Sequence, residues 1–192
     1  MNLTEEEQII QLQAGSLEAL GQFYDRYQRM VYRTALAITG DAEAAADLLQ
    51  DVFLRLFRFA YHIDAKRPLE PWLYRMTTNL AYTWVKRSRR WLHPLEDLVD
   101  RISFTGKPSL QDVVERKDEL EMVQRAISSL PLAQRVVVVL YYLNDLSLSE
   151  ISEILEVPVG TVKSRLHYGR LALKKRLGIK EDGLLDLNYD RY

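Results

Sequence analysis

Two stretches of the sequence are rich in lysine and arginine and contain no acidic residue. The basic residues between positions 160 and 180 are Lys163, Arg165, Arg170, Lys174, Lys175, Arg176 and Lys180. Those between positions 71 and 95 are Arg75, Lys86, Arg87, Arg89 and Arg90. Clustered cations separated by acidic segments are suited to contact with a polyanion such as nucleic acid. They are equally compatible with helix faces that only contact solvent, so the neighbouring residues have to discriminate between the two.

The C-terminal basic stretch lies in a sequence that is typical of a helix-turn-helix. Ser147 and Glu150 have the spacing of a capping box, which predicts a short helix over 148–155. A short Val-Pro-Val-Gly turn then leads into a second helix over 158–177. At about 100° per residue, one narrow face of this second helix is formed by Val162, Leu166, Gly169, Leu173 and Leu177. This face is expected to pack inward.

The other side of the second helix carries residues that can contact DNA. Near the helix start, where a recognition helix meets base edges in the major groove, the outward side chains are Lys163, Ser164, His167 and Tyr168. Serine can donate or accept a hydrogen bond, and lysine can reach the acceptors of guanine. Flanking cations suited to phosphates are Arg165, Arg170, Lys174 and Lys175. An αα-hairpin in an ordinary helical bundle gives a similar pattern, but the unopposed basic charge favours DNA.

The second basic stretch predicts a helix over 71–91 with two unlike sides. Its apolar side is expected to hold Leu73, Met76, Leu80 and Trp84. The other side carries Arg75, Asn79, Tyr82 and Lys86, with Thr83 beside them. Bases stack on aromatic rings and phosphates follow cations, so this side suits single-stranded or partly opened nucleic acid. The preceding loop from Tyr61 to Arg67, which includes Lys66, is a further candidate for one wall of a pocket for an extruded base.

A different kind of surface is predicted on the helix over 42–61. One of its sides carries Asp47, Gln50, Asp51, Leu54 and Arg58, opposite an apolar side. A leucine surrounded by charged and polar residues is the layout of a protein–protein contact. A solvated helix face with a single exposed leucine gives the same pattern, so both interpretations stay open.

Composition places these helices in an all-α protein of two small modules. The 192 residues are 47% hydrophobic and 28% charged, as in a globular protein. With only eight glycines and six prolines, the sequence has few residues that break helices, which indicates an all-helical chain. The expected helices cover 16–40, 42–61, 71–91, 116–129, 132–144, 148–155 and 158–177. We predict one module over 1–93 and a second over 116–178. They are joined by an acidic linker over 94–115 and followed by an acidic tail over 179–192.

Composition also limits the kinds of site that the chain can hold. The sequence has no cysteine, which excludes disulfides, thiolate metal sites and a cysteine nucleophile. The three histidines lie far apart in the sequence, so we expect no metal and no cofactor. The acidic N-terminus differs from a signal peptide, and the longest apolar run is too short to span a membrane. We therefore expect a cytoplasmic protein without direct membrane insertion.

Three segments of the sequence, in this order, resemble bacterial sigma factors of the extracytoplasmic-function (ECF) group. DAEAAADLLQDVFLRLFRF (41–59) is similar to the helix of that family that binds core RNA polymerase. PWLYRMTTNLAYTWVKRSRR (71–90) is similar to its minus-ten promoter helix. The segment 130–177 is similar to the domain that reads the minus-thirty-five element. The resemblance spans about residues 10–180 and implies two helical domains on a linker, without the third domain of larger relatives.

The resemblance implies a protein that directs core RNA polymerase to specific promoters and assists strand opening, and that is not an enzyme. Residues expected on the clamp helices of the largest polymerase subunit are Asp47, Gln50, Asp51, Leu54 and Arg58. Residues expected to hold the minus-ten element and a flipped base are Tyr61, Lys66, Arg67, Arg75, Asn79, Tyr82, Thr83 and Lys86. Residues expected at the minus-thirty-five element are Lys163, Ser164, Arg165, His167, Tyr168, Arg170 and Lys174. The implied partners are core polymerase (clamp and flap), promoter DNA and an anti-sigma factor.

Two other classes of function are compatible with parts of the sequence. An autonomous helix-turn-helix regulator would share the helix pair over 147–177, but it leaves the helix over 71–91 unexplained, and no ligand or receiver domain is evident. A helical enzyme acting on nucleic acid could use Asp47 and Asp51, one helical turn apart, to bind a metal. The sequence offers no matching carboxylates, phosphate-binding loop or nucleophile–base set for that chemistry.

Overall fold

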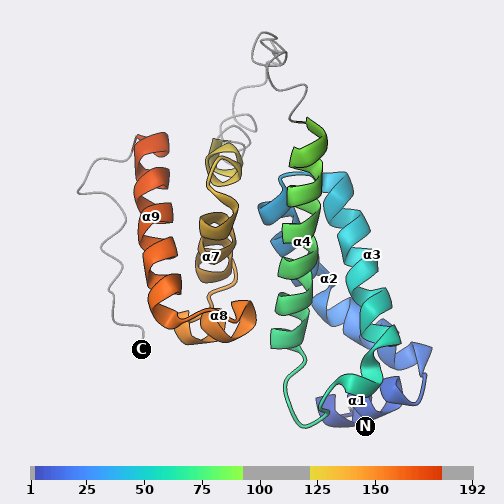
Figure 1. The fold of residues 1–192 in the computed structure, drawn as a ribbon. Helices are drawn as coiled ribbons and strands as arrows, with labels where there is room; N and C mark the ends of the chain where they lie inside the picture. Colours follow the sequence, from blue (N-terminus) through green and yellow to red (C-terminus); the bar gives the residue numbers. More distant parts are fainter. Residues whose placement is uncertain (1–2, 93–121, 179–192) are drawn as a thin grey trace, which may run out of the picture.

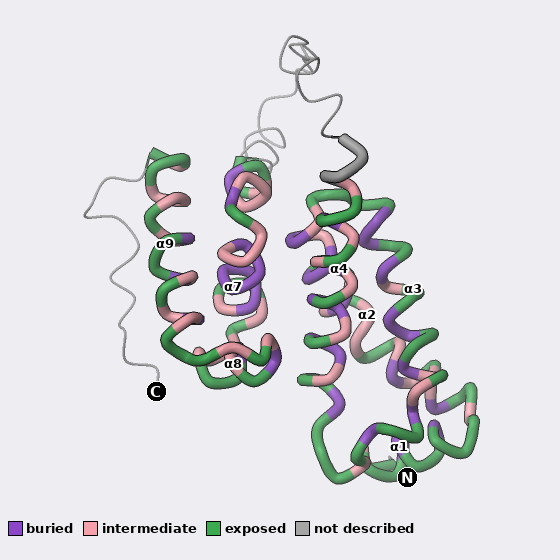
Figure 2. Tube along the Cα trace, in the orientation of Figure 1, coloured by how far each residue is buried: buried purple, intermediate pink, exposed green. Residues whose placement is uncertain are grey.

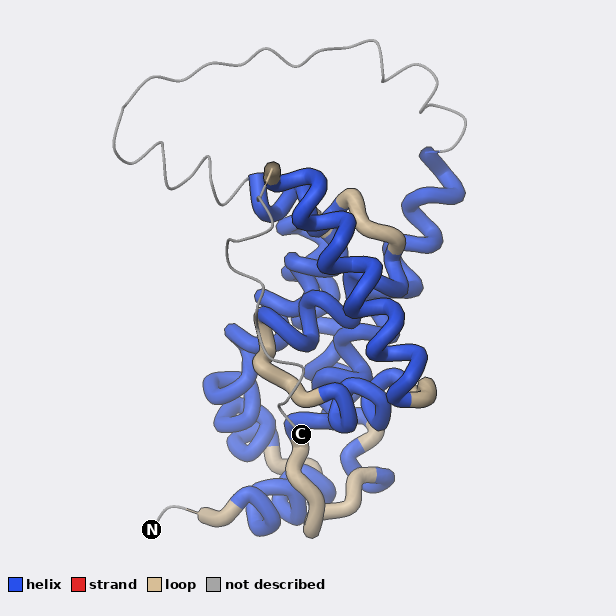
Figure 3. The backbone as a smooth tube through the Cα atoms, turned by 90° about the vertical axis from the view of Figure 1, so that its left-hand side faces the viewer, coloured by secondary structure: helices blue, strands red, loops and turns tan. Residues whose placement is uncertain are grey.

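The computed structural model describes residues 3–92 and 122–178 (Figure 1). The helices are α1 (Glu5–Gln13), α2 (Leu17–Thr39), α3 (Ala42–Arg58), α4 (Glu70–Leu92), α7 (Leu132–Tyr142), α8 (Leu148–Leu155) and α9 (Val159–Leu177), with a 3-10 turn η1 (Ala60–His62) and a helical segment at 122–128. Within the described ranges Figure 3 shows helix and loop without a strand, which confirms the all-α class. The predicted linker over 94–115 and the tail over 179–192 lie outside the described residues.

Local capping signals explain why most helices begin and end where the sequence predicts. Ser16 caps α2, because its hydroxyl accepts the Ala19 N–H at 3.2 Å. Gly40 ends the same helix in the left-handed conformation at φ +73°. The Asp41 carboxylate then accepts the Ala44 N–H at 2.9 Å and starts α3. At α8 the predicted capping box of Ser147 and Glu150 is formed in both directions, and these hydrogen bonds lower the pKa of Glu150.

The N-terminal helix α1 is the main element that the sequence interpretation missed. Thr4 and Glu7 form a second capping box there, in the same pattern that marks α8. Other differences are small: α3 ends at Arg58 and continues as the short turn η1, and α7 ends at Tyr142. The chain leaves the α7 direction where Asp145 takes a positive φ of 55°.

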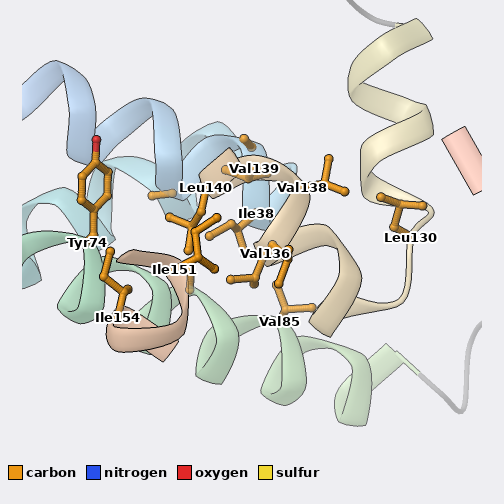
Figure 4. Close-up of a cluster of buried hydrophobic side chains, with 14 of the residues drawn as sticks. Ile38, Tyr74, Val85, Leu130, Val136, Val138, Val139, Leu140, Ile151 and Ile154 are labelled. Atoms are coloured by element: carbon orange, nitrogen blue, oxygen red, sulfur yellow. The ribbon is translucent and has the colours of Figure 1, made fainter. Parts of the chain in front are cut away.

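Two hydrophobic clusters hold the fold together, and the larger one spans both modules. The N-terminal cluster lies among α1 to α4 and includes Ile9, Leu12, Phe23, Val52, Leu56, Leu69 and Leu73. The shared cluster joins Ile38 of α2, Tyr74 and Val85 of α4, Ile151 of α8, and the α7 residues between Val136 and Leu140. Figure 4 shows these side chains converging between the helices, and Figure 2 shows how much of α7 is buried. The second module therefore packs on α2 and α4 rather than standing apart.

Polar contacts also join the second module to α2. Arg135 is 2% exposed and donates to the carbonyls of Ile38 (2.6 Å), Leu130 (3.3 Å) and Ser128. The Asn144 amide donates to the Thr34 hydroxyl at 2.7 Å, and the Gln124 amide donates to the Leu36 carbonyl at 3.2 Å. The bond from this buried guanidinium to the Ile38 carbonyl links the second module to α2, and the bonds to Ser128 and Leu130 hold the same side chain within its own module.

We expect Arg135→Met to lower the free energy of unfolding by about 3 kcal/mol, because buried carbonyls lose a charged donor. Methionine keeps the length and apolar volume of the side chain but donates no hydrogen bond. Urea unfolding followed by circular dichroism measures the change. Arg29→Met, at an exposed position of α2, is the matched control and is expected to change stability by less than about 0.5 kcal/mol. Equal stability of the two variants would show that the Arg135 hydrogen bonds contribute nothing net.

Candidate nucleic-acid and polymerase interfaces

The inward face of α9 packs closely against α7. Val162, Leu166 and Gly169 are buried, as the spacing predicts, whereas Leu173 and Leu177 of the predicted face are half-buried. A Cβ atom added at Gly169 would lie 2.7 Å from the Val138 Cγ2 atom, so the absence of a side chain lets the two helices approach each other. This packing fixes which residues of α9 face outward.

The outer side of α9 carries the residues predicted to read the minus-thirty-five element. Ser164, His167 and Tyr168 are exposed, and the Ser164 hydroxyl donates to the Thr161 carbonyl at 3.0 Å. The rings of His167 and Tyr168 contact each other edge to face at 5.4 Å between centroids. The half-buried cations among the predicted residues are Lys163, Arg165, Arg170 and Lys174. The first turns of α9 thus present hydrogen-bonding and aromatic groups with cations around them, and their role in DNA contact stays a prediction.

The polar side of α4 also faces outward. Arg75, Asn79, Thr83 and Lys86 are exposed, and the Thr83 hydroxyl donates to the Asn79 carbonyl at 2.8 Å. Tyr82 is half-buried at the edge of the shared cluster, and the Lys86 ammonium lies 4.6 Å from its ring centroid. The predicted line of cation, amide, aromatic ring and cation is therefore present on one side of the helix.

The buried side of α4 is broader than the predicted apolar stripe. Leu73 is buried as expected, but Met76, Leu80 and Trp84 are half-buried. The buried residues around the helix are Leu73, Tyr74, Thr77, Thr78, Ala81 and Val85. The reason is that α4 packs on α2 and α3 on one flank and on α7 and α8 on the other. Burial raises the pKa of Tyr74 far above its ordinary value, so its hydroxyl stays neutral in this contact.

One predicted DNA-contacting residue of α4 is engaged by the second module. The Arg75 guanidinium forms an ion pair with Glu156, the residue that ends α8 in the left-handed conformation at φ 53°. Glu156 thus lies in the turn of the helix-turn-helix. The two residues are far apart in the sequence, and no local pattern connects them.

The loop before α4 exposes the side chains that were predicted to surround a base. Tyr61 is 67% exposed and its ring contacts His62 at 4.0 Å between centroids. Lys66 and Arg67 are exposed, and Arg67 lies 3.5 Å from the Asp64 carboxylate. Gln13 and Glu5 of α1 hydrogen-bond to the two ends of this loop. The sequence interpretation did not include these two residues, although the capping box at Thr4 was a signal for their helix.

The exposed side of α3 contains the five residues predicted to contact core polymerase. They are Asp47, Gln50, Asp51, Leu54 and Arg58. Leu54 is 64% exposed, while Val52, Phe53 and Leu56 on the other side are buried. In Figure 1 α3 lies on the far side of α2 and α4 from α9, so this surface is distant from the helix-turn-helix. It combines an apolar side chain with a charged surround, and its partner stays a prediction.

Within residues 3–92 and 122–178, no three histidine or acidic side chains lie close enough to form a metal-binding group. Among the helices of the same ranges, none has the length and apolar content needed to cross a bilayer.

Comparison with known proteins assigns both helical modules to one family. The family model "Sigma-70 region 2" matches residues 23–91, and "Sigma-70, region 4" matches residues 120–173. The chain is 31% identical over 184 residues to the ECF RNA polymerase sigma factor SigW of Bacillus subtilis, and the alignment covers 92% of this chain and 98% of SigW. The matched ranges include α3, α4 up to residue 91 and the helix-turn-helix up to residue 173.

Two solved structures share the fold at lower sequence identity. CnrH, solved in complex with the cytosolic domain of CnrY, has a TM-score of 0.67 at 21% identity and covers 91% of this chain and 97% of its own. The sigma factor RpoE, solved with the anti-sigma factor NepR from Bartonella quintana, has a TM-score of 0.66 at 19% identity and covers 85% and 99%. Because the chain matches both sigma-70 family models and is 31% identical to SigW over nearly the whole length of both proteins, it belongs to the ECF RNA polymerase sigma factors.

Proposed function

We propose that this sigma factor divides promoter recognition among three separate surfaces. The exposed side of α3 binds the clamp of core polymerase, the loop at 61–67 and α4 bind the minus-ten element, and the outer side of α9 reads the minus-thirty-five element. The observation that supports this division is that each surface is exposed on a helix whose opposite side is buried. The core thus holds each helix in place mainly through residues other than those proposed to contact DNA or polymerase, with Tyr82 at the edge of the shared cluster as an exception.

The chemistry of each surface matches its proposed partner. Unpaired bases can stack on Tyr61 and Tyr82 while phosphates contact Arg75 and Lys86, which is the common way that proteins hold single strands. Ser164 and Lys163 at the start of α9 can reach base edges in duplex DNA. Strand opening then follows from binding, because a sigma factor that holds unpaired bases shifts the promoter toward its melted state. No step of this mechanism is catalytic.

Binding to the minus-ten and minus-thirty-five elements at the same time requires the two modules to separate. The names of the two promoter elements place them about 25 base pairs apart, which is about 85 Å at about 3.4 Å per base pair. In the free chain, Arg75 on the proposed minus-ten surface contacts Glu156 in the helix-turn-helix. A contact between the minus-ten surface and the turn of the helix-turn-helix is incompatible with that separation. The linker over 94–115 is proposed to span the distance between a module at 1–93 and a module at 116–178.

The remaining partners follow from the family. CnrH and RpoE were solved with CnrY and the anti-sigma factor NepR respectively, and an anti-sigma factor is the corresponding partner proposed for this chain. The second module is also proposed to contact the polymerase flap. The site of action is the cytoplasm, where polymerase and promoter DNA meet.

Reconstituted transcription tests the proposal. The protein is mixed with sigma-free bacterial core polymerase and a genomic promoter pool, and the transcripts are sequenced. Transcripts that share a two-block motif upstream of their starts are expected. Lys163→Ala together with Ser164→Ala should weaken selection at the upstream block by about 5- to 150-fold, the range for one lost base contact, without weakening core binding.

Arg176→Ala removes one cation at the far end of α9 and serves as the control for lost charge. We expect it to weaken all promoters alike, since a phosphate contact carries no sequence information. If the Lys163 and Ser164 variant also loses core affinity, or if it weakens every promoter equally, then the start of α9 does not read the upstream element.

A further inference from the structure

The loop between α3 and α4 is tied at both ends to α1, a helix that precedes the range matched by the region 2 family model. In Figure 1 α1 lies beside this loop, and its residues contact η1. The loop carries three of the residues proposed to surround an extruded base, which are Tyr61, Lys66 and Arg67. Anything that fixes the two ends of the loop therefore fixes where these side chains can go.

Gln13, at the end of α1, holds the first part of the loop. Its side-chain amide donates one hydrogen bond to the Ala60 carbonyl at 3.2 Å and another to the Ile63 carbonyl at 2.8 Å. An amide nitrogen has two N–H donors, so both are used here. The two carbonyls flank Tyr61 and His62, and Ala60 and Ile63 are themselves buried. The exposed ring of Tyr61 therefore belongs to a turn whose backbone is hydrogen-bonded to Gln13 both before and after Tyr61.

Glu5, in the first turn of α1, holds the other end. Its Oε1 atom accepts the backbone N–H of Leu69 at 2.8 Å, directly before α4 begins. Its Oε2 atom accepts from Arg26 at 3.1 Å and from the Tyr27 hydroxyl at 3.0 Å, both on α2. One carboxylate therefore connects α1, α2 and the start of α4. Burial and the bond to Glu5 raise the pKa of Tyr27 to about 12, so this hydroxyl keeps the proton that it donates.

We propose that α1, through Gln13 and Glu5, is the positioning element that orders the base-holding loop before DNA arrives. Neither residue contacts DNA in this proposal. A loop that is already ordered loses less conformational freedom when it takes up a base, so its affinity for the unpaired strand is higher. The inference rests on the proposed function, in which the loop holds a base of the minus-ten element.

The test compares three binding reactions of the full chain. These are binding to core polymerase alone, binding of the holoenzyme to a duplex promoter recovered in the reconstitution, and binding to the same promoter with its minus-ten bases unpaired by mismatches. Gln13→Glu keeps the shape of the side chain but removes both donors. We expect about tenfold weaker binding to the mismatched promoter and core binding within about twofold, since the α3 surface is unaffected.

Three comparison variants make the outcome specific. Gln11→Glu places the same change at an exposed position of α1 and should leave all three reactions unchanged. Glu5→Gln keeps an acceptor for the Leu69 N–H, so it should retain more binding to the mismatched promoter than Glu5→Ala. This rescue by the conservative variant is not expected if Glu5 acts only through its negative charge.

Tyr61→Ala separates failure of this inference from failure of the proposed function. If Tyr61→Ala weakens the mismatched promoter but Gln13→Glu does not, α1 has no positioning role and the base-holding loop stands. If neither variant has an effect, the loop does not hold a base and both proposals fall. A loss of core binding with Gln13→Glu, to the same extent as promoter binding, would also overturn the inference, because α1 would then only support the fold.

Discussion

A disulfide that joins the two modules is expected to abolish promoter-dependent transcription, with Gly40→Cys and Ser128→Cys as the substitutions. Gly40 lies between α2 and α3, and Ser128 lies in the helical segment that precedes α7. A Cβ atom added at Gly40 would lie 3.7 Å from the Ser128 Cβ atom. This separation is within the usual disulfide range of about 3.5–4.5 Å. Since the natural chain has no cysteine, the designed bond is the only disulfide that one molecule can form.

The expected effect follows from the distance between the promoter elements. The covalent bond holds together modules that share a hydrophobic cluster and the Arg75–Glu156 ion pair. On a promoter the same modules have to contact elements whose centres lie about 85 Å apart at about 3.4 Å per base pair. In the oxidised double variant almost no molecules have separated modules, which is the arrangement that can bind the promoter. We therefore expect transcript yield to fall by more than about a hundredfold. Binding to core polymerase through α3 should continue, because that surface stays exposed in the closed arrangement.

Reductant provides the control within the same preparation. Adding dithiothreitol should restore transcription to the level of the reduced double variant, and neither single variant should respond to oxidation. Gly40→Cys also places a side chain at φ +73°, at a cost of about 1–2 kcal/mol, and the single variant measures that cost separately. Full transcription by the oxidised protein would show that the modules act on the promoter without separating.

Features that depend on neighbouring residues could be read from the sequence. The caps at Ser16, Asp41 and Ser147 bond to backbone groups a few residues away, so their helices begin where the sequence predicts. The exposed side of α3 was also predictable, since helical periodicity alone separates Asp51 and Leu54 from the buried side. The capping box at Thr4 is an equally local signal, so the start of α1 was also predictable from the sequence.

Contacts between the modules could not be read from the sequence. Arg135 bonds to a carbonyl 97 positions away, and no periodicity indicates which helix it approaches. The broad buried side of α4 has the same origin, because a second packing partner buries Tyr74 and Val85 in addition to the predicted stripe. The pairing of Arg75 with Glu156 likewise depends on tertiary arrangement. The sequence grouped Arg75 and Asn79 together as DNA-contacting residues because of their chemistry. In the free chain, however, Arg75 forms an ion pair with the second module, whereas Asn79 only faces outward.

The other large expected effect is a loss of core-polymerase affinity in Asp51→Arg. Asp51 is exposed in the middle of the proposed polymerase surface, next to Asp47 and Leu54. An acidic surface is expected to face cations of the partner, and a like charge placed there costs several kcal/mol, so we expect binding to weaken by about a hundredfold or more. Arginine is a good helix former, so the stability of the free protein should change by less than about 0.5 kcal/mol. Asp25→Arg, the same change at an exposed position of α2, is the control.

Transcription at increasing core concentration distinguishes this defect from a defect in promoter reading. Asp51→Arg leaves the α4 and α9 surfaces intact, so holoenzyme that does form should choose the same promoters as the natural protein. Its transcript yield should recover when core polymerase is raised by the factor by which affinity fell, by mass action. Variants of Lys163 and Ser164 should not recover in this way, because their holoenzyme is already formed. If the transcript yield of Asp51→Arg stays low at saturating core polymerase, the exposed side of α3 acts after polymerase binding. That surface would then need a different partner.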